Sequence, residues 1–318
     1  MLSEFVTLLG FSFGVTGPIF ALVFLGIMLK KLRVVDDTFT HSASKLVFLV
    51  AMPTMLFMSM ITTDIRSLID ASYLLYALTG TLVLFVLFSL VTPLIVKERR
   101  DRGVFIQGAF RGNLAIVGLA FSFNAYGALG LAKASILMSV MTILYNLLSV
   151  YTLTASLSND RVKISQLLIN IAKNPLIIAL VIGIPCSLLA IPFPTVLTTA
   201  GDYVARMTLP LALICIGAAM SLGELKNSSS VSGIAVFAKL IVVPIAMIYP
   251  AYLFGFESTD LGVLFLMVSA PTAAASYIMV QGMGGNGNLA ANIVVISTLA
   301  SVITVSFGLA ILKQLGII

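Results

Sequence analysis

Helix-breaking and polar residues interrupt two apolar stretches of this sequence. The first, "FRGNLAIVGLAFSFNAYG" at 110–127, loses its apolar run at Gly112 and Asn113, and the second, "LMVSAPTAAASYIMVQG" at 266–282, loses it at Pro271. A helix that breaks at membrane depth exposes free backbone groups and a half-helix N-terminus, which carries roughly half a positive charge. Two such ends aimed at one point would stabilise an anion without a buried Lys or Arg.

Four polar side chains near these breaks have two interpretations each. Asn113 and Asn146 could contact a substrate or form helix–helix hydrogen bonds. Thr272 and Ser276 follow Pro271 at a spacing of four, so they share a helix face. They could bind a carboxylate, or they could satisfy the carbonyl groups that the proline frees.

Charged residues within the apolar stretches also have two interpretations. Arg111 lies near the end of its stretch, where its side chain could extend to the interface or attract an anion at the inner mouth. Lys239 is interpreted mainly as an interfacial anchor. Asp202 and Arg206, four residues apart, are placed near the outer end of their stretch, where they neutralise each other and could line a vestibule.

Several kinds of chemistry lack the residues they need. The one histidine, His41, excludes a multi-histidine metal site, and no nucleophile–base constellation supports an enzyme, so we expect neither a metal nor a cofactor. Neither break contains Asp or Glu, so coupling to protons or sodium is not visible. Cys186 and Cys215 lie in apolar stretches and are expected to be free thiols.

Composition indicates a protein embedded in a lipid bilayer. The chain of 318 residues is 60% hydrophobic and 9% charged, with a mean hydropathy of +1.14, whereas soluble domains carry about 25% charged residues. The net charge of +6 lies in short loops and is interpreted as a topology signal rather than a nucleic-acid surface. We therefore expect an all-α integral membrane protein.

Ten apolar segments are long enough to cross a bilayer, which takes about 20 residues. They are 12–32, 43–63, 71–96, 103–125, 130–155, 168–190, 199–222, 231–255, 261–283 and 289–313. Lys and Arg concentrate in the loops after the first, third and fifth segments, which include Lys97, Arg161 and Lys163. This bias predicts a multi-pass protein of the cell (inner) membrane with both termini on the non-cytoplasmic side.

A repeat with an offset of 157 residues divides the chain. Pro18, Pro53 and Pro93 each precede a proline by 157 positions, namely Pro175, Pro210 and Pro250, and Gly127 precedes Gly284 by the same offset. Two repeats of five segments, 1–157 and 158–318, must be inverted because five is odd. Such inverted repeats place a substrate between broken helices at the midplane. The offset aligns Leu114 with Pro271, so the breaks in segments four and nine should lie at equal depth and cross.

The chain resembles a known family across nearly its whole length. The stretches that carry the resemblance include "NPLIIALVIGIP" (174–185), "TLPLALICIGAAMSL" (208–222), "SAPTAAASYIMV" (269–280) and "GGNGNLAANIVVISTLAS" (284–301). They resemble the auxin efflux carrier family, which includes bacterial malonate and malate permeases and plant PIN proteins. The resemblance implies ten spans, a scaffold bundle, a transport bundle and a homodimer.

The resemblance also implies a substrate site. The family's substrate-facing asparagine falls on Asn113 beside Gly112, its second crossing proline on Pro271, and a polar position of the fifth segment on Tyr145 and Asn146. Thr272, Ser276 and Pro53 complete the expected site. One position departs from the family, because Ala120 stands where a proline is usual. The break in segment four must therefore depend on Gly112, Asn113 and Gly118.

These observations favour a secondary transporter for a small organic anion. The substrate would be a mono- or dicarboxylate such as malonate or malate, or an auxin-like acid, moved by alternating access. The alternative is a cation-coupled carrier of the same fold that moves sodium, protons, or a neutral or sterol-like solute. A receptor without transport is a third possibility, which the inverted repeat disfavours.

Overall fold

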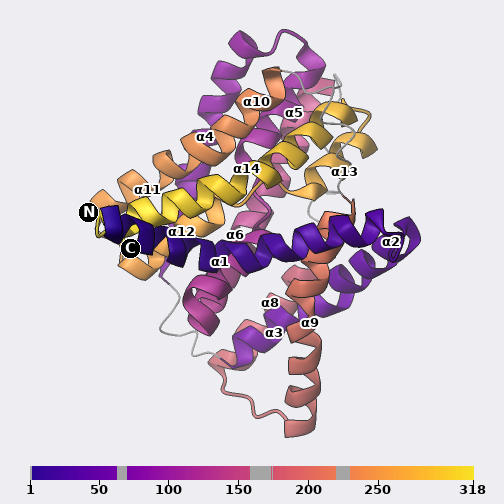
Figure 1. Ribbon diagram of the computed structural model, residues 1–318, viewed down its shortest axis with the longest axis vertical. Helices are drawn as coiled ribbons and strands as arrows, with labels where there is room; N and C mark the ends of the chain where they lie inside the picture. The colour runs from indigo at the N-terminus through magenta and orange to yellow at the C-terminus, as the bar shows by residue number, and fades with distance from the viewer. Residues whose placement is uncertain (1, 63–69, 158–172, 174, 220–229) are drawn as a thin grey trace.

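Helices make up 86% of the computed structural model, and no strand occurs in the part of the chain that it describes. The described residues are 2–62, 70–157, 173, 175–219 and 230–318 (Figure 1). Some expectations fall partly or wholly outside the described residues. They are the span boundaries at 63, 168 and 222, the repeat boundary at 157/158, and the charges of Arg161 and Lys163. The expected all-helical class is confirmed.

The first half of the chain begins with the long helix α1. It comprises α1 (Leu2–Lys31), α2 (Asp37–Leu46), a π-helical turn (Val47–Ala51), α3 (Met52–Ile61), α4 (Ala71–Ile95), α5 (Arg99–Phe110), a π-helical turn (Leu114–Gly118) and α6 (Leu119–Leu157). Asp36 and Asp70 start α2 and α4, because the Asp36 carboxylate accepts one backbone N–H group of the first turn and the Asp70 carboxylate accepts two. Gly127, with φ 60° and ψ −144°, divides α6 at the predicted loop between segments four and five.

The second half has a similar order of elements. It comprises α8 (Pro175–Leu188), α9 (Thr195–Ala219), α10 (Ser230–Phe237), a π-helical turn (Ala238–Val242), α11 (Val243–Leu253), α12 (Ser258–Val268), α13 (Ala274–Gly282) and α14 (Gly287–Gln314). Cys186 and Cys215 are free thiols, as expected. Within the described residues, six helical stretches are long and apolar enough to cross a membrane: Asp37–Ile61, Ala71–Ile95, Leu114–Leu157, Thr195–Ala219, Ser230–Leu253 and Gly287–Gln314.

Two groups of helices meet along α1. In Figure 1, α3, α8 and α9 gather below α1, and α4, α5, α10 and α11 lie above it. Helix α1 crosses α9 so closely that glycine is required on both helices. A Cβ on Gly26 would lie 2.1 Å from the Ile214 carbonyl oxygen, and one on Gly217 would lie 1.9 Å from the Val23 carbonyl oxygen. Small residues at such crossings let helix backbones touch.

Candidate functional site

The two broken helices meet through their backbones. The amide nitrogen of Asn113 donates a 2.7 Å hydrogen bond to the Pro271 carbonyl oxygen, and the Ala273 nitrogen donates one of 3.3 Å to the Arg111 carbonyl oxygen. Gly112 and Thr272 thereby face each other as in a short antiparallel bridge. Each break satisfies backbone groups of the other, which is the condition for irregular backbone at membrane depth. The sequence had aligned the two breaks to within one residue.

Different residues produce the two breaks. Pro271 has no N–H to donate, so the helix that ends with Val268 cannot continue through it. In the first break, Arg111 and Asn113 have non-helical backbone angles, and a π-helical turn begins at Leu114. The Gly118 nitrogen then donates to the Asn113 carbonyl oxygen over 3.0 Å. A widened turn therefore interrupts this helix, although Ala120 stands where a proline is usual in the family that the sequence resembles.

Gly112 leaves no room for a side chain at the bridge. A Cβ there would lie 3.1 Å from the Lys239 ammonium nitrogen and 3.3 Å from the Ala270 carbonyl oxygen. Both distances are shorter than ordinary contacts of a methyl group. The glycine therefore allows a lysine of another helix to reach the crossing.

Asn113 and Tyr145 both lie at the crossing, as expected. Asn113 is buried, and its side-chain amide has no hydrogen-bond partner among the described residues. Tyr145 is buried too; its hydroxyl faces the backbone of Gly112, and its ring packs edge-on against Phe110 at 5.5 Å between centroids. The Asn113 side chain is therefore available to a solute.

Arg111 does not extend to the interface, so that interpretation of the sequence was wrong. Its residue is buried, and its guanidinium donates to Asn146 Oδ1 at 2.9 Å, to Ser149 Oγ at 3.2 Å and to Met279 Sδ at 2.6 Å. These partners lie on α6 and α13. No carboxylate pairs with Arg111 in the part of the chain that the structure describes. Asn146 thus holds the arginine, and the guanidinium keeps its full positive charge beside the break.

Lys239 is also a core residue and not an interfacial anchor. Its exposed fraction is 0%, and its ammonium nitrogen donates to the Val268 carbonyl oxygen at 2.6 Å. That carbonyl belongs to the last turn of α12, the negative end of a half-helix. The lysine lies within a π-helical turn, which widens its helix at this point. The anticipated anion site without a buried Lys or Arg therefore contains one of each.

The hydroxyl groups on either side of Pro271 divide between two roles. Thr272 donates through Oγ1 to the Gly108 carbonyl oxygen at 2.8 Å, and its own nitrogen donates to Ser297 Oγ at 3.1 Å. Thr272 therefore holds the crossing together. The hydroxyl oxygens of Ser269 and Ser276 are buried and have no partner among the described residues. They remain available to a bound solute or water.

Pro53 lies apart from the paired breaks. It is half-buried in the first turn of α3, directly after a π-helical turn. Of the eight residues expected to form the site, the structure brings seven to the crossing or its immediate neighbours. Those seven are Gly112, Asn113, Tyr145, Asn146, Pro271, Thr272 and Ser276. Pro53 instead starts the helix that borders a cavity.

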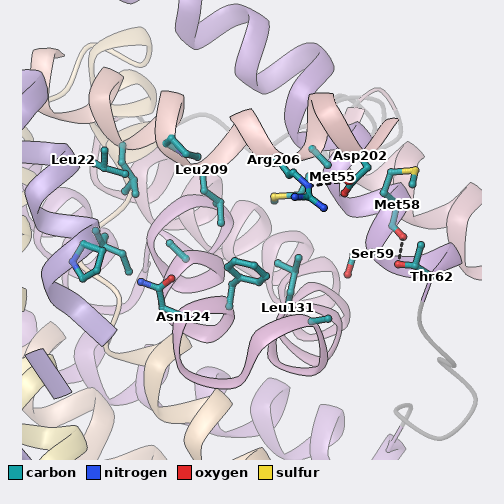
Figure 2. Close-up of a pocket in the computed structure, with 18 residues that line it drawn as sticks. Leu22, Met55, Met58, Ser59, Thr62, Asn124, Leu131, Asp202, Arg206 and Leu209 are labelled. Atoms are coloured by element: carbon teal, nitrogen blue, oxygen red, sulfur yellow. Dashed lines mark hydrogen bonds and ion pairs between the residues drawn. The ribbon is translucent and has the colours of Figure 1, made fainter. Parts of the chain in front are cut away.

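A cavity of about 540 Å³ separates α6 from α1, α3 and α9 (Figure 2). Its walls are mostly apolar, with Leu22, Met55, Leu131 and Leu209 among them. Ala120 of α6 lines it two residues after the π-helical turn that follows the first break, so the cavity borders the broken helix. The volume is sufficient for a small organic molecule.

Asp202 and Arg206 are the charged residues among the described lining of this cavity. Their side chains form an ion pair, with 2.8 Å between Arg206 Nε and Asp202 Oδ2. Both residues line a cavity, as the sequence suggested. Arg206 lies about 17 Å along α9 from Thr195 and about 20 Å from Ala219, at about 1.5 Å per residue, and so near the middle of the helix.

The described residues contain no group of three His, Cys, Asp or Glu side chains that could hold a metal ion. A further ion pair, Lys133 with Asp260 at 2.6 Å, joins α6 to α12 beside a second cavity of about 320 Å³. The carboxylates of these ion pairs therefore lie away from the crossing, where the guanidinium of Arg111 carries a positive charge.

Comparison with known proteins identifies transporters. The family model described as a membrane transport protein matches residues 15–309. A protein of Rhizobium meliloti (strain 1021) named "Putative malonate transporter" is 25% identical over 312 residues, which cover 95% of this chain and 96% of that protein. An "Uncharacterized transporter" of Methanothermobacter thermautotrophicus (strain Delta H) is 21% identical over 288 residues, which cover 90% of this chain and 93% of that protein. The family and these relatives are transporters and not enzymes.

Proposed function

We propose that this chain, which belongs to the membrane transport protein family, is a secondary carrier of a small organic anion. Family membership confirms the resemblance to auxin efflux carriers that the sequence indicated. One observation carries the choice of an anion. Arg111 and Lys239 are both buried at the paired breaks, and no carboxylate neutralises either among the described residues. A buried guanidinium without a counter-ion is costly, and a bound anion would offset that cost.

The substrate would lie between the two half-helices. Its carboxylate would take hydrogen bonds from the Asn113 amide and Ser276 hydroxyl, which lack partners among the described residues. Arg111, oriented by Asn146, and Lys239, held by the Val268 carbonyl, would supply the positive charge. Mono- and dicarboxylates such as malonate or malate, or an auxin-like acid, fit these groups. Malonate is included because the relative from Rhizobium meliloti is named "Putative malonate transporter".

We further propose that ten spans form two inverted five-helix repeats, 1–157 and 158–318. Two observations support this architecture. Gly127 and Gly284, which are 157 residues apart, both have positive φ, of 60° and 74°. Helix α1 (span one) packs against α9 (span seven), and helix α8 (span six) packs against α3 (span two). Inverted repeats require two such equivalent contacts, because spans six and seven are the repeat counterparts of spans one and two.

Transport would proceed by alternating access. The group of α1, α3, α8 and α9 would serve as the scaffold, and the helices around the crossing would move against it. The cavity between α9 and α6 lies along that division and would be the entry path from one side of the membrane. We retain the expected cell-membrane location, the termini on the non-cytoplasmic side, and a homodimer.

The alternative function is a cation-coupled carrier of the same fold. It would need a carboxylate at the crossing, and the described residues around the breaks supply Lys239 there instead. Sodium or proton dependence of uptake would nevertheless favour this alternative.

Counterflow in proteoliposomes tests the proposal. Vesicles are preloaded with malonate or malate, and uptake of the labelled acid is compared among the intact protein, Asn113→Ala and Arg111→Gln. We expect uptake by the intact protein and a loss of about tenfold or more in each variant, the effect of removing one charge-assisted contact. Lys97→Gln, which removes an exposed charge, is the control. Absence of uptake by folded intact protein for a panel of organic anions would refute the proposal.

A further inference from the structure

Arg206 is a charged residue within a helix of membrane-spanning length, where charged residues are rare. It lies near the middle of α9, a helix of membrane-spanning length, and its side chain is 78% exposed to the open space beside that helix. Figure 2 shows the side chain between α9 and α6, where it lines the cavity together with Asp202. Ionisable residues within membrane-spanning helices are rare and often mark a solute path.

Stability does not account for the pair that Arg206 makes with Asp202. An exposed ion pair at a spacing of four contributes little to the stability of a helix. Apolar residues would stabilise a helix within a membrane better than two charges would. The pair must therefore have another use in this cavity.

The hydrogen bond within the pair leaves part of the guanidinium unused. Asp202 Oδ2 accepts from Nε at 2.8 Å, and the two terminal nitrogens have no partner among the described residues. A planar guanidinium held at one edge can still offer two parallel N–H groups to a carboxylate. Asp202 would orient the fork, and it would also neutralise the arginine while the cavity is empty.

We propose that Arg206 is a docking site for carboxylates in the 540 Å³ cavity, separate from the paired breaks, with Asp202 as its positioning residue. The site takes a solute with a carboxylate at one end, and the apolar wall formed by residues such as Leu131 and Leu209 contacts the remainder. A solute would bind Arg206 first and then move along α6 towards Asn113. This inference rests on the proposed function, in that the cavity admits organic anions.

Protection of an introduced thiol tests the site without requiring transport. Ser59 lines the same cavity from α3. Ser59→Cys is introduced into a chain in which Cys186 and Cys215 are replaced by serine, and alkylation by a polar maleimide is timed with and without malonate or phenylacetate. We expect at least one of the two acids to slow alkylation by about threefold or more at saturation, as occupancy of a site requires. The same acid should not slow alkylation after Arg206→Gln, and Lys45→Gln, which removes an exposed charge on α2, should retain protection.

Two further variants complete the test. Arg206→Lys keeps the charge but not the fork, so we expect intermediate protection. Asp202→Asn should retain protection, because the amide oxygen still accepts from Nε. Alkylation that neither acid slows, or that an acid slows equally after Arg206→Gln, would overturn the docking site. Protection without counterflow would instead keep the docking site and reject the proposed transport of these acids.

Discussion

The nitrogen of Asn113 and the carbonyl oxygen of Pro271, which are 158 positions apart in the chain, are joined by a hydrogen bond of 2.7 Å. This bond fixes two half-helix ends at one point. Around it lie an amide without a partner among the described residues, the buried side chains of Arg111 and Lys239, and the hydroxyl of Ser276. The backbone pairing therefore determines where the chemistry of the site is concentrated.

Substitution of Gly112 by alanine should reduce transport more than it reduces folding. The new methyl group would lie 3.1 Å from the Lys239 nitrogen and 3.3 Å from the Ala270 carbonyl oxygen, so one of them must move. We expect counterflow to fall by about tenfold, while overpacking lowers stability by about 1–3 kcal/mol. Gly233→Ala is the matched control, because a Cβ there meets nothing within 4 Å. Equal counterflow in the two variants would contradict a tight crossing.

Substitution of Lys239 by methionine should separate charge from packing. Methionine has a similar length and removes a buried charge, which favours folding, but it leaves the Val268 carbonyl oxygen without its donor, which costs about 1–3 kcal/mol. We expect the melting temperature to change by only a few degrees and counterflow of the anion to fall by about tenfold or more. Lys97→Met, at an exposed site, should change neither. Unchanged counterflow in the Lys239 variant would remove this lysine from the site.

The position of the breaks could be predicted because local rules determine it. Pro271 has no N–H, and Gly112 with Asn113 weakens a helix wherever it lies, so both breaks were visible in the residues themselves. The common offset then placed the breaks at equal depth. Their mutual hydrogen bonds follow from the need to satisfy freed backbone groups.

The surroundings of the charged residues could not be predicted in the same way. Hydropathy shows that a segment is buried, but it does not show which neighbour packs against a given face. Arg111 was therefore placed at an interface, although its guanidinium donates hydrogen bonds to Ser149 and Met279 in the core. Depth along the helix was the signal that was overlooked. Lys239 lies about 13 Å along its helix from Ser230, at about 1.5 Å per residue, which is too deep for an interfacial anchor.

Substitution of Gly217 by valine should destabilise the scaffold group. Any Cβ at this position would overlap the Val23 carbonyl oxygen at 1.9 Å, and a backbone atom cannot move aside without separating α1 from α9. We expect a loss of folded protein in detergent, measured by size-exclusion fluorescence and thermal denaturation. Gly201→Val on the same helix should be milder, because its Cβ would meet the flexible side chain of Met58 at 2.7 Å. Equal stability of the two variants would refute the close crossing.

The ion pair between Lys133 and Asp260 should couple α6 to α12 strongly. The two side chains are 12% and 10% exposed and 2.6 Å apart, so removal of one partner leaves a largely buried charge. We expect Lys133→Met and Asp260→Asn each to lower the free energy of unfolding by about 3–5 kcal/mol, and the double variant to lose clearly less than the sum. Thermal denaturation of all four proteins measures this coupling. Lys30→Gln removes a partner from the exposed pair with Asp37 and should cost less than about 1 kcal/mol. Additive losses at Lys133 and Asp260 would show that the pair does not join the two helices.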